Sequence, residues 1–135
     1  MSVNYLAVVV VAIIGFLLGW LWYSPVLFVK AWMEEMKFTP ETMEACKPKM
    51  ASLMAKGFLT TLLSTFGLAV LITAHGSENW IKGAAFGFFI GAMVVGLRQV
   101  NCNLWEGRSL KLQLITVGHE VALYTLQGAI LGVWR

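Results

Sequence analysis

Charged residues are scarce in this sequence, and their scarcity excludes most classes of soluble protein. Only 13% of the 135 residues are Asp, Glu, Lys or Arg, whereas 59% are hydrophobic. A soluble domain averages about 25% charged residues and cannot cover its surface with so few. The net charge of +3 is also too small for a nucleic-acid-binding surface. The composition excludes a disordered chain, a nucleic-acid-binding domain and an ordinary cytosolic enzyme, and it indicates one integral membrane domain.

Cysteines and catalytic motifs are equally sparse. The two cysteines, Cys46 and Cys102, are too few for a disulfide framework or a zinc cluster. The two histidines, His75 and His119, fall about half a bilayer thickness apart, which is too far for a shared metal ion. The sequence also contains no phosphate-binding loop and no catalytic triad. We therefore predict no enzyme activity, no cofactor and no metal site.

The sequence instead contains long apolar segments. Residues 1–29 contain no Asp, Glu, Lys, Arg or His. The segments long enough to cross a bilayer, which needs about 20 apolar residues, are 5–23, 53–74, 80–100 and 112–134. Four such segments leave too little polar sequence to cover them in water. The predicted fold is an all-α bundle of four transmembrane helices that forms a single membrane domain over residues 1–135.

The distribution of Lys and Arg predicts how these helices are oriented. Eight of the ten basic residues lie in or beside the first and third connections, and two lie on the opposite side. Because basic loops remain in the cytoplasm, we expect these connections inside and both termini outside. Tryptophan and tyrosine prefer the bilayer interface. The expected interface anchors are Trp22, Tyr23, Trp32, Trp80 and Trp134.

The first connection is the only long segment outside the predicted spans. Residues 26–38 carry Phe28, Trp32 and Met36 at helical spacing with charged residues between them, which predicts an amphipathic helix on the cytoplasmic surface. Thr39 and Pro40 are typical of a helix start, so a short second helix should follow and end before Pro48.

Small residues recur at four-residue spacing in three of the four predicted spans, which favours close packing of helix backbones. These glycines are Gly15 and Gly19, then Gly83, Gly87 and Gly91, then Gly128 and Gly132. The spacing leaves open whether the packing partner lies in the same chain or in a second copy. The triple spacing in residues 80–100 predicts self-association through that helix.

A polar stripe crosses the last predicted span. It consists of Gln113, Thr116, Glu120, Tyr124 and Gln127, at spacings of three and four residues that put them on one helix face, with His119 beside them. Glu120 lies nine residues, or roughly 13 Å, beyond Lys111 and therefore near the middle of the hydrocarbon. A carboxylate at that depth must face the bundle interior, pair with a cation or take up a proton.

Two hypotheses for this stripe remain open. In the structural one, Arg98 reaches Glu120 across a helical hairpin, and the ion pair locks two helices together. In the functional one, Glu120 and His119 form a protonatable intramembrane site, to which Arg98, Tyr124 and Gln127 also belong.

Several short motifs carry a resemblance to a known family. They are Val3-Asn4-Tyr5, Trp22-Tyr23-Ser24-Pro25 with Phe28, Lys30, Ala31 and Trp32 after it, Glu106-Gly107-Arg108-Ser109, and Gly128-Ala129-Ile130-Leu131-Gly132. Over essentially its whole length the chain resembles the bacterial membrane family known as domain of unknown function 1761. The resemblance implies a small four-helix integral membrane protein and supplies no activity, substrate or catalytic residue.

Two functional classes fit these features. The first is a non-catalytic assembly or accessory subunit of the bacterial inner membrane that packs, through its glycine ridges, against further copies or other membrane subunits. The second is a proton-linked small-molecule transporter or channel-like protein that uses Glu120 and His119. Both require a lipid bilayer and neither involves nucleic acid, and the sequence leaves the substrate open.

Overall fold

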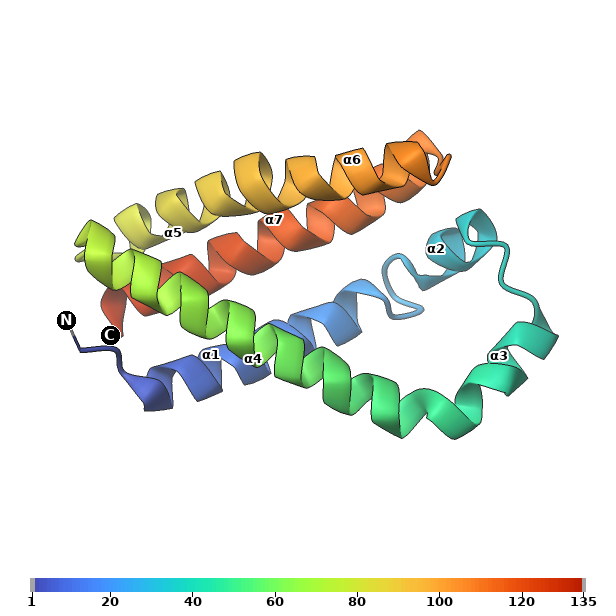
Figure 1. Ribbon diagram of the computed structural model, residues 1–135, viewed down its shortest axis with the longest axis horizontal. Helices are drawn as coiled ribbons and strands as arrows, with labels where there is room; N and C mark the ends of the chain where they lie inside the picture. The colour runs from blue at the N-terminus through green and yellow to red at the C-terminus, as the bar shows by residue number, and fades with distance from the viewer. Residues whose placement is uncertain (1, 135) are drawn as a thin grey trace.

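The computed structural model describes residues 2–134, and every element in that range is helical (Figure 1). The elements are α1 (Tyr5–Trp22), α2 (Val29–Glu35), α3 (Pro40–Cys46), η1 (Lys47–Lys49), α4 (Met50–His75), α5 (Trp80–Phe89), η2 (Ile90–Gly96), α6 (Leu97–Trp105) and α7 (Leu110–Val133). Four helical stretches are long and apolar enough to cross a membrane: α1, α3 with α4, α5 through α6, and α7. The predicted all-α fold with four such helices is confirmed.

The bundle is closed at one end and opens toward the other. The start of α1, the end of α7 and the α4–α5 connection lie at one end, whereas α2, α3 and the α6–α7 turn lie at the opposite end (Figure 1). The main buried core lies at the first end, where α1, α4 and α7 meet through Ala7, Val8, Val11, Leu68, Ala69, Ile72 and Leu131. Toward the second end α1 and α4 diverge (Figure 1).

Local sequence signals set the ends of the long helices. The side chains of Asn4, Asn79 and Ser109 each accept a hydrogen bond from the backbone N–H three residues on, at 3.0, 2.9 and 3.1 Å. These caps satisfy backbone donors that the first turn of a helix leaves free. At the C-terminal end of α4, Gly76 adopts a left-handed φ of 72°, which glycine tolerates without steric cost.

The first connection contains two short helices, and the first of them is shorter than predicted. Residues 26–38 were expected to be helical, but α2 covers only Val29–Glu35. The reason is the turn that follows Pro25: the Phe28 N–H donates to the Trp22 carbonyl at 3.1 Å, and the Leu27 N–H donates to the Ser24 carbonyl at 3.1 Å. The second short helix, α3, begins at Pro40 after a Thr39 cap and ends at Cys46, as predicted.

The third long helix contains a π-helical segment, η2, between α5 and α6. Glycines that face α7 recur every four residues up to Gly91, but the next one, Gly96, comes five residues later and packs on Val117. The wider π turn rotates the following residues around the helix axis. Arg98, which regular α spacing would align with Gly91, is therefore exposed, and Asn103 is buried instead.

The glycine ridges mesh within this single chain. A Cβ atom on Gly83 would fall on the Gly128 carbonyl oxygen, and one on Gly132 would lie 2.6 Å from the Asn79 carbonyl oxygen. Gly87 lies equally close to the Tyr124 backbone. The predicted close packing is thus present between α5 and α7. The prediction that this ridge supports self-association is wrong, because α7 already occupies it; oligomerisation through another face stays a prediction.

Candidate functional site

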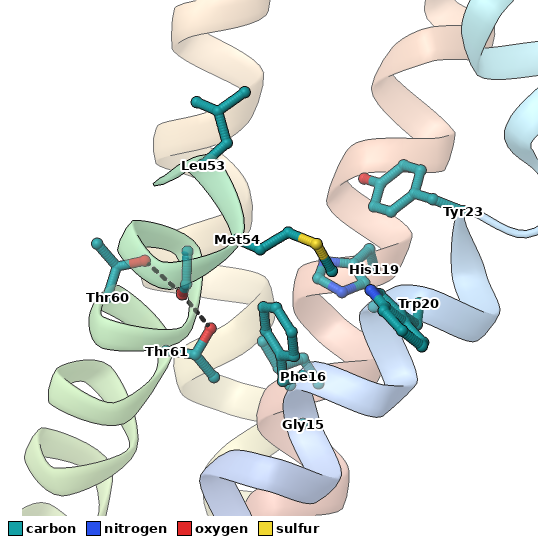
Figure 2. A pocket seen from close by; sticks show the side chains of 12 residues that line it. Gly15, Phe16, Trp20, Tyr23, Leu53, Met54, Thr60, Thr61 and His119 are labelled. Carbon is teal, nitrogen blue, oxygen red and sulfur yellow. Dashed lines mark hydrogen bonds between the residues drawn. The ribbon is translucent and has the colours of Figure 1, made fainter. Parts of the chain in front are cut away.

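A groove of about 470 Å³ lies between α1, α4 and α7, where α1 and α4 diverge (Figure 2). Its lining is apolar and aromatic apart from one histidine, two threonine hydroxyls and the polar ends of a tyrosine and a tryptophan. The lining residues are Gly15, Phe16, Gly19, Trp20, Tyr23, Leu53, Met54, Gly57, Thr60, Thr61, His119 and Leu123. A concave apolar site with few polar groups is typical of a small-molecule binding site.

The groove lining includes one histidine, His119. Its side chain is only 14% exposed and lies between the rings of Trp22 and Tyr23, with centroid distances of 6.0 and 5.4 Å. Nδ1 lies 3.3 Å from Oε1 of Glu120. Nε2 is buried and has no hydrogen-bond partner within the described residues. It points toward α1, since a Cβ atom on Gly19 would lie 3.4 Å from it.

The end of α1 holds the aromatic rings against this histidine. The Trp22 indole Nε1–H donates to the Ile115 carbonyl at 3.0 Å, and its six-membered ring lies over Gly118, where a Cβ would be 3.2 Å away. Tyr23 follows directly, and its ring contacts Trp32 of α2 with a centroid distance of 5.9 Å. Trp22 and Tyr23, predicted as interface anchors, are half-buried against α7, whereas Trp80 is 61% exposed.

Glu120 has a different partner from the one that the structural hypothesis requires. Its side chain is 28% exposed, and its ionic contact within the described residues is with His119. Arg98 forms no ion pair in that part of the chain and lies exposed on α6. The predicted Arg98–Glu120 pair is therefore wrong, because the π-helical segment turns Arg98 away from α7.

Three other residues of the polar stripe lie on either side of the His119–Glu120 pair along α7 and contact neighbouring helices. Thr116 accepts a hydrogen bond from Asn103 Nδ2 at 3.1 Å, which ties α7 to α6. Gln127 is fully buried and donates from Nε2 to Thr65 of α4 at 2.8 Å. Tyr124 lies between these levels and packs against the core. Within the described residues, the side chains of His119 and Glu120 bond only to each other.

Sequence reasoning missed several residues of this site. Phe16, Met54 and Thr61 line the groove, yet each sits in an apolar segment that gives no local signal of function. The role of Trp22 had a signal, because it belongs to the Trp-Tyr-Ser-Pro motif that carries the family resemblance. Its partner Ile115 is 93 positions away, so only the tertiary fold reveals the contact.

A comparison with known protein families matches residues 6–132 to the family described as "Protein of unknown function (DUF1761)". Comparisons with curated proteins and with solved structures found no match. The matched range covers all four long helices almost completely, and it includes both the Trp22–Pro25 turn and His119. The chain therefore belongs to the DUF1761 family.

Proposed function

We propose that this protein is a proton-linked membrane carrier or channel-like protein that binds a small molecule at His119. One observation carries the proposal: His119, which lines a groove of about 470 Å³, has a buried ring nitrogen without a partner within the described residues. A polar atom left unsatisfied at membrane depth costs free energy, so its retention favours a ligand that completes it.

The His119–Glu120 contact gives this nitrogen two states. An ionised Glu120 can only accept a hydrogen bond, so Nδ1 of His119 donates to it, and Nε2 presents a lone pair to the groove. One added proton reverses this arrangement. The added proton binds Nε2, and the hydrogen on Nδ1 then either stays on the ring, which becomes an imidazolium beside the carboxylate, or transfers to the carboxylate, which becomes a carboxyl group that donates to Nδ1. In both cases the groove side of the ring changes from acceptor to donor.

The assembly or accessory-subunit function has weaker support. Its main motive was the triple glycine ridge, and α7 of the same chain fills that ridge. The location in the bacterial inner membrane with both termini outside is part of our proposal. It is supported by four long apolar helices and by the bias of Lys and Arg toward the first and third connections.

Proton-linked transport is tested with purified protein in vesicles that contain a pH-sensitive dye. Small neutral, cationic and anionic aromatic probes are added outside, and proton movement is compared with that in protein-free vesicles. We expect probe-dependent proton movement in the parent and its loss in the double variant with His119→Phe and Glu120→Gln, because neither residue of the pair can then exchange a proton. Glu106→Gln is the control, since Glu106 is exposed in the α6–α7 turn. Absence of such movement in the parent, or equal movement in the double variant, would overturn the proposal.

A further inference from the structure

The geometry points to a neutral, ring-bearing molecule with an O–H or N–H donor, drawn from the bilayer, as the occupant of the groove, with its release driven by one proton. This inference rests on the proposed function and names the chemical class of its substrate. It follows from the polar atoms of the groove, from the absence of charge in its lining, from its aromatic walls and from its opening.

Three polar atoms of the groove lining can accept hydrogen bonds. The hydroxyls of Thr60 and Thr61 both donate to the Gly57 carbonyl, at 2.8 and 3.0 Å, so their hydrogens are used and their lone pairs remain free (Figure 2). Nε2 of His119 adds a third acceptor when Glu120 is ionised. A ligand that completes these three atoms must bring its own hydrogen, as a hydroxyl or N–H group does, and the Tyr23 hydroxyl and the Trp20 indole N–H of the same lining can donate to a hydroxyl oxygen.

No Asp, Glu, Lys or Arg among residues 2–134 lines the groove. Glu120 contacts the opposite nitrogen of the imidazole and is not part of the lining, so it cannot lie directly against a bound cation. A permanent cation or anion would therefore be desolvated without a counterion. The faces of Trp20 and Tyr23 attract a cation on their own, but less strongly than an adjacent carboxylate would. These features favour a neutral ligand.

The walls and the opening indicate the shape of the ligand and its route. Phe16 lies edge-on to Phe58, with a centroid distance of 5.6 Å, and Figure 2 shows Met54 reaching from α4 toward His119. Rings and a thioether together suit a flat aromatic group. Trp20 and Leu53, on either side of the opening, are 60% and 52% exposed, so the groove opens sideways toward lipid.

Protonation of the His119–Glu120 pair would oppose binding of such a donor. The ring nitrogen that accepts the ligand hydrogen becomes a donor itself, and two donors then face each other. Ionisable groups on the helices packed around the pair include Tyr124 and Lys111 of α7, the exposed Lys56 of α4, the exposed Arg98 of α6, and Lys30, Glu34 and Glu35 of α2, with Tyr23 directly after α1; Glu34 and Glu35 contact Lys111. None of these makes a hydrogen bond to Nε2, so the proton state of the pair governs the acceptor.

The test compares two probes that differ only in the donor: 4-octylphenol and its methyl ether, 4-octylanisole. Binding to purified protein in lipid nanodiscs is followed by tryptophan fluorescence, because Trp20 lines the groove and Trp22 contacts His119. Empty nanodiscs correct for partition into lipid. We expect saturable phenol binding at least about tenfold tighter than ether binding at about pH 8, and loss of that preference at about pH 5.5.

Two variants tie the preference to the imidazole. His119→Phe keeps an aromatic ring and removes the imidazole acceptor, so the preference for the phenol should fall to the part that Thr60 and Thr61 supply. His75→Gln is the control and should keep the preference, since His75 lies at the other end of α4 and bonds Ser77. If His119→Phe does not fold, the parent comparison still decides. Equal binding of phenol and ether by the parent, tighter binding of octyltrimethylammonium, or a preference unchanged by pH would overturn the inference.

The binding test and the vesicle test can give different results, and each combination identifies which proposal is wrong. Phenol preference without proton movement would overturn the carrier function and leave the ligand class standing. Proton movement driven by a cationic or anionic probe, without phenol preference, would overturn the ligand class and leave the carrier function standing.

Discussion

Arg98 and Glu120 should contribute to stability independently of each other. Arg98 is exposed on α6, after the π-helical segment, and the ionic contact of Glu120 is with His119 at 3.3 Å. Removing one partner of a buried ion pair costs about 3–5 kcal/mol, whereas effects at sites that share no contact add to within about 0.5 kcal/mol. We therefore expect the coupling free energy between Arg98→Ala and Glu120→Gln to be below about 0.5 kcal/mol.

The assay is a double-mutant cycle on the free energy of unfolding, measured by denaturation of the purified protein in mixed micelles. Parent, Arg98→Ala, Glu120→Gln and the double variant are unfolded under identical conditions. A second cycle on Glu106 and Arg108, which form an exposed pair at 3.0 Å, provides a reference for a weak interaction of about 0–1 kcal/mol. A coupling of about 3 kcal/mol between Arg98 and Glu120 would refute our reasoning and restore the structural lock.

Two further predictions concern packing and orientation. Gly87→Ala should destabilise the bundle by about 1–3 kcal/mol or prevent folding, because its Cβ would fall on the Tyr124 carbonyl. Gly67→Ala, in open space on α4, should be neutral or stabilising by up to about 1 kcal/mol in the same unfolding assay; equal effects would contradict the described α5–α7 packing. A cysteine introduced at the exposed Glu78 should react with a membrane-impermeant maleimide in intact cells, while Cys46 should react only after permeabilisation. The reverse labelling pattern would invert the proposed orientation.

The long helices could be predicted from sequence because a bilayer imposes a length and a polarity that composition records directly. Their starts were also partly visible, since Thr39 and Ser109 are residues that cap helices through their own side chains. The turn after Pro25 shows where this local reasoning ends. Pro25 predicted the end of α1. The hydrogen bond from the Phe28 N–H to the Trp22 carbonyl makes α2 begin later than predicted, and no local pattern signals that bond.

The pairing of side chains between helices could not be predicted, and η2 shows why. A π turn has no composition of its own, because it forms where packing against a neighbour favours a wider turn. Here Gly91 and Gly96 both press against α7, five residues apart. A register that assumes regular α geometry places Arg98 on the wrong face, and the error extends to every contact beyond it. The bond between Asn103 and Thr116 was missed for the same reason.

The polar side chains along one face of α7 are buried for different reasons, some structural and one that we interpret as functional. At Thr116 and at Gln127 a polar side chain meets a hydrogen-bonding partner on another helix, although Oε1 of the same Gln127 side chain is buried without a partner within the described residues. At His119 a buried nitrogen has no such partner, although Trp22 and Gly19 bring α1 close enough to supply one. An apolar residue would pack there without the cost of an unsatisfied polar atom. Local rules of stability are broken mainly where a protein binds or reacts; on this helix they are broken at Gln127 Oε1 and at His119, and of these two residues His119 is the one that lines the groove.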